Sequence, residues 1–223
     1  MSDRTLVVFV KDPRPGAVKT RLARDVGPDT AALVYRALAE AVLESTTPAP
    51  GEYERLVFFD PPEARRALRE WLPGVWLRAQ ARGDLGERLA DAFARAFARG
   101  AARVAIVGSD APELSRETVL RALAALDAAD VVLGPAEDGG YYLIALREPH
   151  PELVRGVDWS TPAVLRQTLE RAATARLEVR RLEPLRDVDT LADIRAVWPA
   201  LEPRLARRPD LRRALARALA LPG

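Results

Sequence analysis

The sequence predicts an α/β fold in which helices cover a largely parallel sheet. Short apolar runs rich in β-branched residues alternate along the chain with longer segments of helical periodicity. Connections of ordinary length favour right-handed crossovers between the strands. With 48% hydrophobic and 30% charged residues over 223 positions, the chain is long enough to bury a full core. We expect a main domain at residues 1–200 and a helical extension rich in Arg, Leu and Ala at residues 201–223.

The individual segments follow from local patterns, taken in chain order. Continuous apolar runs predict strands at residues 5–10, 54–59, 75–80, 104–107, 131–133, 141–146 and 177–182. Apolar residues at helical spacing predict helices at residues 20–24, 30–45, 62–71, 83–99, 115–126, 163–173 and 191–198. The first long helix should pack on the sheet through Leu33, Tyr35, Leu38 and Val42. Ser115 is predicted to be a helix cap, and Thr190 with Asp193 matches a capping box.

Composition argues against several kinds of chemistry. The chain has no cysteine, which excludes disulfides, zinc–thiolate sites and cysteine nucleophiles. Its one histidine lies between two prolines, as in a surface turn, so a Ser-His-Asp triad is poorly supported. The net charge of +2 comes from charges that alternate along helices, which argues against nucleic acid as a partner. The apolar run at residues 5–10 is too short for a signal peptide or a membrane span, so we expect a cytoplasmic protein.

The loop after the first predicted strand, residues 11–21, is strongly cationic. Of the 34 basic residues only Lys11 and Lys19 are lysines, and both lie in this loop together with Arg21. Lysine is a compact charge on a flexible stem, suited to following a phosphate, and the backbone amides around Gly16 would also favour an anion. The loop is not a Walker P-loop, because a valine and not a glycine precedes Lys19. A solvated basic turn is the alternative interpretation.

Acidic residues follow three later strands. Asp110 comes directly after the fourth predicted strand, and Asp187 and Asp189 follow the last one. The turn Glu137-Asp138-Gly139-Gly140 follows the fifth strand, and its two glycines leave room for a ligand, with a plain hairpin turn as the alternative. The carboxyl ends of parallel strands meet at one edge of a sheet, where open α/β folds bind ligands. We therefore expect these acidic groups to face the cationic loop.

Two further segments are candidates for contacts with a nucleotide. Gly83 and Gly86 flank the start of a predicted helix and would let a nucleotide approach the backbone, whereas Asp84 between them is also explained as an N-cap. Trp159 precedes the helix at residues 163–173 and is a weaker candidate for lining a pocket.

Together these loops predict a site for a divalent metal and a nucleotide. Mg²⁺ and Mn²⁺ prefer oxygen ligands and typically combine one or two carboxylates with phosphate and water. Asp110 is the candidate metal ligand. Cations for phosphate next to such a metal indicate a nucleotide substrate, which would react with a small-molecule acceptor.

Five motifs in order make the sequence resemble a known family. They are the stretches at residues 11–22, 83–89, 108–112, 137–142 and 187–190. They are similar to motifs of the bacterial GT-A-type transferases known as radical-SAM/selenodomain-associated transferase 1, and more distantly of 2-phospho-L-lactate guanylyltransferase and molybdenum cofactor guanylyltransferase. The resemblance implies a GT-A-like (nucleotide-diphospho-sugar transferase) three-layer α/β/α fold with a mostly parallel mixed sheet. It also implies that Asp110 is the principal metal ligand and Asp189 a second metal or phosphate contact.

Nucleotidyl transfer is the reaction that we expect first. An acceptor phosphate would attack the α-phosphorus of a nucleoside triphosphate, and pyrophosphate would leave. Lys11, Lys19 and Arg21 would neutralise the triphosphate, while Asp110 and Asp189 would hold the metal. A triphosphate needs more positive charge than a diphosphate does, which is why the cationic loop favours this reaction.

Two alternatives remain open from the sequence. In glycosyl transfer the metal would hold the diphosphate of a nucleotide sugar, with Asp138 or Glu137 as the base. The usual Asp-x-Asp motif of glycosyltransferases is absent, because residue 108 is glycine and residue 112 is proline. The second alternative is a nucleotide-binding subunit without catalytic activity. The leucines of the C-terminal extension hint at docking on its own domain or at a homodimer.

Overall fold

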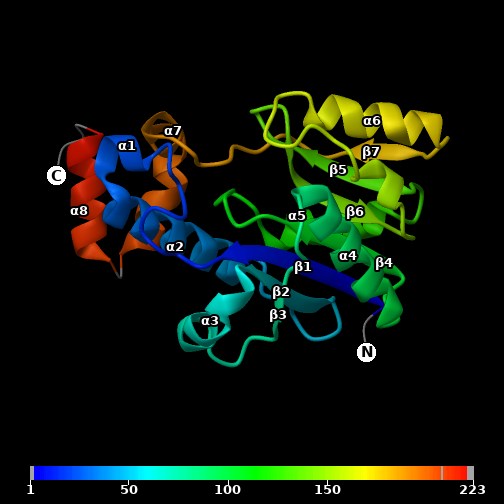
Figure 1. Cartoon of the computed structure of the whole chain (residues 1–223), viewed down its shortest axis with the longest axis horizontal. Helices are drawn as coiled ribbons and strands as arrows, with labels where there is room; N and C mark the ends of the chain where they lie inside the picture. The colour runs from blue at the N-terminus through cyan, green and yellow to red at the C-terminus, as the bar shows by residue number, and fades with distance from the viewer. Residues whose placement is uncertain (1–2, 207, 220–223) are drawn as a thin grey trace.

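The computed structural model describes residues 3–206 and 208–219. They form three layers, a central sheet with a layer of helices on each face (Figure 1). The strands are β1 (Arg4–Lys11), β2 (Glu54–Asp60), β3 (Leu77–Ala79), β4 (Arg103–Val107), β5 (Val131–Pro135), β6 (Tyr141–Leu146) and β7 (Val179–Arg181). Their order is β3-β2-β1-β4-β6-β5-β7. Strand β6 is antiparallel to β4 and β5, whereas the other neighbouring pairs are parallel. The predicted α/β fold with a mostly parallel mixed sheet is confirmed.

Helices cover both faces of the sheet. They are α1 (Ala23–Val26), α2 (Pro28–Ser45), α3 (Arg65–Trp71), α4 (Leu85–Ala98), α5 (Arg116–Ala125), α6 (Val164–Thr174), α7 (Leu191–Leu201) and α8 (Pro209–Ala218), with short 3₁₀ turns η1 (Pro62–Ala64), η2 (Pro151–Leu153) and η3 (Glu202–Leu205). Helices α2, α3 and α5 pack on one face, and α4 and α6 pack on the other. No helix in the described part of the chain is both long enough and apolar enough to cross a bilayer.

The apolar core is divided between the two faces because successive strand residues point in opposite directions. Phe59 is buried under α3 with Leu68, whereas its neighbour Phe58 is buried on the opposite face with Phe93 of α4. Fully burying a side chain of this size stabilises the fold by about 1.5–3 kcal/mol.

A third apolar cluster lies at one end of the molecule, where α1, the first half of α2, α7, η3 and α8 pack together (Figure 1). We call this group of helices the helical cap. Leu211, Leu215 and Leu219 of the C-terminal segment are buried in it against the chain's own α1 and α2. The leucine stripe of the C-terminal extension is therefore covered without a second copy of the chain.

Several local expectations are wrong in detail. Leu33 is 46% exposed, because it lies on the side of α2 that neither the sheet nor the helical cap covers. Strands β3 and β7 are shorter than their apolar runs, since each is an edge strand with one partner. The short helix expected at residues 20–24 begins later, as α1.

Candidate active site at the carboxyl edge of the sheet

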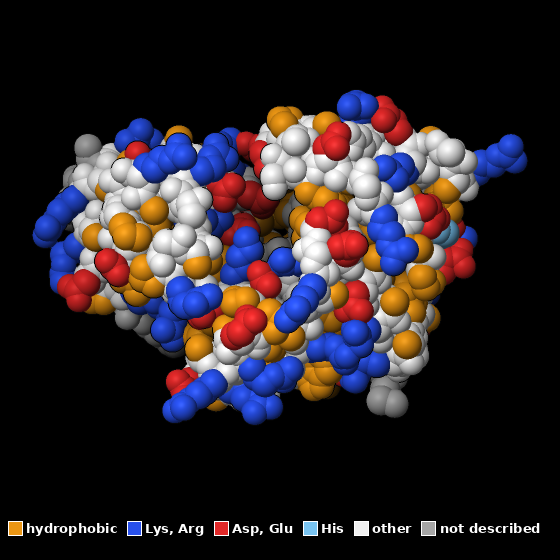
Figure 2. Space-filling view, viewed as in Figure 1, with side chains coloured by type: hydrophobic (Ala, Val, Ile, Leu, Met, Phe, Trp, Pro, Cys, Tyr) orange, Lys and Arg blue, Asp and Glu red, His pale blue; other side chains and the backbone are white. Residues whose placement is uncertain are grey.

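Two acidic groups from distant parts of the chain share one buried lysine. Lys19 Nζ lies 2.5 Å from Asp110 Oδ1 and 2.9 Å from Asp189 Oδ1. The lysine side chain is only 4% exposed, whereas those of Asp110 and Asp189 are 39% and 43% exposed. In Figure 2 acidic side chains gather in the hollow between the helical cap and the sheet, with basic side chains beside them. The two carboxylate side chains thus remain partly accessible to solvent, whereas the ammonium that they share is buried.

The loop after β1 is built to direct Lys19 inward. Val18 is buried beside α2, and Leu22 is buried in the helical cap, so the chain is fixed on both sides of the lysine. Lys19 itself has φ +48°, in the left-handed region that side chains other than glycine seldom adopt. Such a conformation persists only where the surrounding contacts enforce it, and it is common at functional sites.

The aspartates meet because the segment that carries Asp189 pairs with the loop after β4. The amide of Val188 donates a hydrogen bond to the carbonyl of Asp110 over 3.0 Å. Val188 is fully buried in the core of the helical cap. Asp187 and Asp189 flank this buried valine, and both interact electrostatically with Lys19.

Negative charge at this edge exceeds what Lys19 alone can neutralise. Burial acts to lower the pKa of Lys19, but the charges of Asp110 and Asp189 outweigh burial and raise it, so the ammonium stays protonated. Burial opposes ionisation of Asp189 as well, yet Lys19 lowers its pKa below the ordinary value. For Asp187, burial and the neighbouring charge of Asp110 raise the pKa to about 7, although Lys19 partly offsets them. An added cation would relieve this surplus of negative charge.

The residues at this edge fit a divalent cation. Asp110 and Asp189 already direct one oxygen each at the same positive charge, and Mg²⁺ or Mn²⁺ commonly takes one or two carboxylates and completes its shell with phosphate and water. The described residues contain no group of three or more His, Cys, Asp or Glu side chains placed to enclose an ion. The donor set therefore suits a metal that arrives with a phosphate ligand better than a fully protein-bound ion.

Two exposed cations of the same loop also act on Asp189. Arg21 is 66% exposed and lies 3.7 Å from Asp189. Lys11 is exposed at the end of β1. Burial raises the pKa of Asp189, and the charges of Lys19, Arg21 and, to a smaller extent, Lys11 lower it. Gly16 has φ +78° in an exposed turn with open space around it. Lys11 and Arg21 are thus the accessible cations, whereas Lys19 is the buried one.

The turn between β5 and β6 is a hairpin that approaches the same edge. Asp138 is exposed and accepts a hydrogen bond from the amide of Gly140 over 2.9 Å, and its charge contributes to raising the pKa of Asp187. Gly139 has φ +91°, and a side chain there would meet the backbone of Pro162. Gly139 therefore serves the turn and its packing, and a role of Gly139 and Gly140 in nucleotide binding remains a prediction. Asp138 brings a further carboxylate toward the cluster.

Glu137, in contrast, is already engaged. Its carboxylate forms an ion pair with Arg186, which also lies 3.5 Å from Asp193 in the capping box of α7. This link ties the hairpin to the start of the helical cap.

The glycine-rich start of α4 is explained by local structure. Asp84 accepts a hydrogen bond from the amide of Glu87, and the Glu87 side chain returns a contact to the amide of Asp84, which completes a capping box. Gly83 has φ +110°, and the Glu87 carboxylate occupies the position that a side chain there would need. Gly86 allows α4 to pack closely on Trp159. A role of Gly83, Asp84 and Trp159 in nucleotide binding remains a prediction.

Two residues of the site were missed by sequence reasoning. The hydroxyl of Tyr35 lies 2.9 Å from Ser109 Oγ and accepts a hydrogen bond from the amide of Lys11 over 2.6 Å. The available signals were the position of Ser109 next to Asp110 and a phenol on an otherwise aliphatic helix face, since a buried tyrosine hydroxyl usually has a partner.

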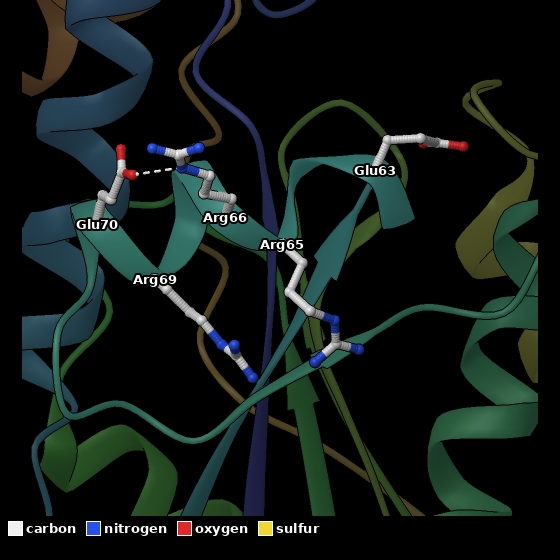
Figure 3. A pocket seen from close by; sticks show the side chains of 5 residues that line it. All are labelled: Glu63, Arg65, Arg66, Arg69 and Glu70. Carbon is white, nitrogen blue, oxygen red and sulfur yellow. Dashed lines mark hydrogen bonds and ion pairs between the residues drawn. The ribbon is translucent and has the colours of Figure 1, made fainter.

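A separate hollow of about 520 Å³ lies on the outer side of α3, and it does not resemble a binding site (Figure 3). Its lining side chains point in different directions: Arg66 turns to its helix neighbour Glu70, while Arg65 and Arg69 turn the other way. Spacing of four residues between Arg66 and Glu70 is typical of a solvated helix face. The acidic pair around Lys19 remains the candidate site.

Comparison with known sequences finds one matching family model. Residues 43–161 match the model of a family described as an uncharacterized protein conserved in bacteria (DUF2064). No curated protein has a sequence that matches this chain.

Solved structures match almost the whole chain. A crystal structure from Desulfovibrio desulfuricans, of a protein provisionally classed as a nucleotide-diphospho-sugar transferase, is 34% identical, with a TM-score of 0.86 over 96% of this chain and 99% of that chain. CMP:2-keto-3-deoxy-manno-octonic acid synthetase complexed with CTP is 16% identical, with a TM-score of 0.55 over 94% and 100% of the two chains. Rv0371c of Mycobacterium tuberculosis, complexed with manganese, is 18% identical, with a TM-score of 0.51 over 87% and 97%. The last two comparisons concern the fold alone.

Proposed function

Because the chain belongs to the DUF2064 family and shares its fold with nucleotide-using transferases, we propose that it is a metal-dependent nucleotidyltransferase. The observation that carries this proposal is the convergence of Asp110 and Asp189 on one cation at the edge of the sheet. The exposed cations Lys11 and Arg21 flank that pair. A nucleoside triphosphate needs a metal ion and positive charge around its phosphates. The carboxylate pair would hold the metal, and the exposed side chains of Lys11 and Arg21 would bind the phosphates.

The proposed reaction is an in-line displacement at phosphorus. A phosphate oxygen of the acceptor forms a bond to the α-phosphorus, the bond from that phosphorus to the bridging oxygen breaks, and pyrophosphate leaves with the electron pair. Lys11 and Arg21 bind the β- and γ-phosphates and neutralise charge that develops on the leaving group. Asp110 and Asp189 would hold Mg²⁺ or Mn²⁺, which polarises the phosphoryl oxygens when bound.

Glycosyl transfer is the second candidate, and one observation favours it. The Desulfovibrio protein that is 34% identical is classed among nucleotide-diphospho-sugar transferases. In that reaction the diphosphate of a nucleotide sugar would leave, and Asp138 would be the base, because Glu137 is paired with Arg186.

A thermal-shift panel separates these proposals. The purified protein is heated with each nucleoside triphosphate and with common nucleotide sugars, each with and without Mg²⁺ or Mn²⁺. A ligand at a hundred times its Kd stabilises the fold by about 2.7 kcal/mol, which raises Tm by roughly 5 to 10 °C for a chain of this size. We expect a metal-dependent shift with one triphosphate.

The other outcomes are equally informative. A shift with a nucleotide sugar alone would replace the first proposal by glycosyl transfer. A shift with a nucleotide that does not depend on metal, and without product formation, would indicate a binding subunit without catalysis.

A further inference from the structure

The hydroxyl of Tyr35 joins the two strand ends that carry the proposed site. It accepts a hydrogen bond from the amide of Lys11, the last residue of β1, over 2.6 Å. It also lies 2.9 Å from Ser109 Oγ, in the loop that follows β4. Tyr35 is 2% exposed and Ser109 is 3% exposed, so water does not substitute for either partner easily.

The ring of the same tyrosine supports the cationic loop. Tyr35 shares an apolar cluster with Val18, the residue before Lys19. Through its hydroxyl it contacts the backbone of Lys11, and through Ser109 it reaches the residue before Asp110. Tyr35 thus contacts the backbone of Lys11, the residue before Lys19 and the residue before Asp110.

The protonated phenol is the form that can serve this role. Burial and the nearby charge of Asp110 raise the pKa of Tyr35, although its hydrogen bonds to Ser109 and Lys11 act in the opposite direction. A neutral hydroxyl can accept from the Lys11 amide and still donate its own proton to Ser109. If the phenol oxygen were removed, the Lys11 amide and the Ser109 hydroxyl would each lose a hydrogen-bond partner, which is costly in a buried site.

From these contacts we infer that Tyr35 is a positioning residue that holds the cationic loop and Asp110 in register with one another. Its effect on substrate binding rests on the proposed function, whereas its effect on the backbone of the loop does not. Tyr35 touches no reacting atom in this role. It fixes the distance between the loop cations that would bind phosphate and the Asp110 carboxylate that would bind the metal. Small errors in such a distance are costly for catalysis.

The test compares Tyr35→Phe with a matched control, Tyr53→Phe. Tyr53 is also buried, and its hydroxyl donates to the carbonyl of Thr46 over 2.7 Å, at the far end of α2 from Tyr35. Both variants keep the aromatic ring and lose one buried hydroxyl, so both should lower Tm to a similar extent. Only Tyr35→Phe should change the site.

Two readouts distinguish positioning from general stability. Amide hydrogen exchange over residues 11–21 should become faster in Tyr35→Phe and stay as in the wild type in Tyr53→Phe. The Kd for inorganic tripolyphosphate with Mn²⁺, measured by calorimetry, should rise about tenfold in Tyr35→Phe, the factor expected when a buried hydrogen-bond partner is lost. Tyr53→Phe should leave this Kd unchanged.

Ser109→Ala provides a second, milder variant in case Tyr35→Phe does not fold. It removes one hydrogen-bond partner of the phenol. Amide exchange over residues 11–21 and the Kd for tripolyphosphate should both rise, by smaller factors than in Tyr35→Phe.

If Tyr35→Phe and Tyr53→Phe show the same amide exchange over residues 11–21, the positioning role is wrong. If wild-type protein binds no tripolyphosphate but the exchange difference is present, the proposed function fails and the positioning role stands.

Discussion

Lys19 and a divalent cation would compete for the same two carboxylate oxygens. The ammonium forms ion pairs of 2.5 Å with Asp110 and 2.9 Å with Asp189. An ion that binds these oxygens must replace the ammonium, which can then turn on its flexible stem toward an incoming phosphate. Lys19 therefore stabilises the two carboxylates while no metal is bound, and it lowers the affinity of the site for a metal ion that arrives without a phosphate ligand.

Replacing Lys19 tests this competition. We expect Lys19→Met to tighten Mn²⁺ binding by the protein without nucleotide, by about tenfold if roughly 1.4 kcal/mol of competition is removed. The same variant should bind tripolyphosphate more weakly, because a cation has been lost. Electron paramagnetic resonance of free Mn²⁺ measures the first effect.

Lys11→Met is the matched control, since it removes an exposed cation of the same loop. It should weaken tripolyphosphate binding and leave binding of Mn²⁺ alone unchanged. Equal or weaker Mn²⁺ binding by Lys19→Met would show that the lysine organises the two carboxylates and does not compete for them.

The carboxylate of Asp110 has a separate test. Asp110→Asn keeps the shape of the side chain but removes its charge, so it should abolish nearly all turnover, since a bound metal contributes several kcal/mol to transition-state stabilisation. Asp127→Asn is a suitable comparison, because Asp127 pairs with Arg103 and does not contact the acidic pair. An Asp110→Asn enzyme with wild-type turnover would exclude a role for this carboxylate in metal binding.

At the scale of elements, α2 connects the helical cap to the sheet. Near its middle, Glu40 accepts hydrogen bonds from Arg36 and from the indole of Trp71, and it pairs with Arg208 just before α8. Burial opposes ionisation of Glu40, but these donors and the charge of Arg208 lower its pKa below the ordinary value. Ionised Glu40 therefore ties three elements together.

This shift has a defined sign in the dependence of stability on pH. A carboxylate whose pKa is lower in the folded state contributes stability above its unfolded pKa, and that contribution is lost as the pH falls through the folded value. Glu40→Gln should thus lower Tm at neutral pH and have progressively less effect below about pH 4.3, the ordinary pKa of glutamate. Thermal unfolding of both proteins from pH 3 to pH 7 measures the difference, and a Tm difference that is constant across this range would contradict the assignment.

Elements determined by nearby residues could be predicted well from the sequence. The Ser115 cap and the Thr190–Asp193 capping box depend on contacts within four residues, and both are present. The turn at residues 137–140 is compatible with an antiparallel β5–β6 hairpin, but the insertion of β6 between β4 and β5 depends on distant strand pairing, which no local pattern encodes. Leu33 was misplaced for a related reason, because helical spacing does not reveal which neighbour covers each side of α2.

The candidate site could be predicted in part for the same physical reason. Asp110 and Asp189 were expected together because strand ends converge at one sheet edge. The burial of Lys19 was not predicted, since it requires Val18 and Leu22 to be fixed by two different apolar clusters. Tyr35 was expected only to pack, because its hydrogen bonds join residues 24 and 74 positions away along the chain.

At the scale of the whole molecule, the site lies where the helical cap meets the sheet, and each supplies half of it. Asp110 follows a strand, whereas Asp189 lies just before Thr190, the N-cap of α7, and Leu22 anchors the Lys19 loop in the core of the helical cap. Packing inside the helical cap should therefore influence ligand binding at a distance. Leu215 of α8 is fully buried in that core, in the same apolar cluster as Leu22 and Val188, which makes it a suitable probe.

Leu215→Ala should lower the free energy of unfolding by about 2–5 kcal/mol, the usual cost of this substitution in a core. Leu123→Ala, on the face of α5 that packs on the sheet, is the matched control, because Leu123 is equally buried. At a temperature where both variants are folded, only Leu215→Ala should weaken Mn²⁺–tripolyphosphate binding, since only it loosens the segments that carry Lys19 and Asp189. Calorimetric titration of the two variants measures this difference. Equal affinities would mean that the helical cap adds stability without positioning the site, and the links through Val188 and Leu22 would then be too weak to transmit a cavity of this size.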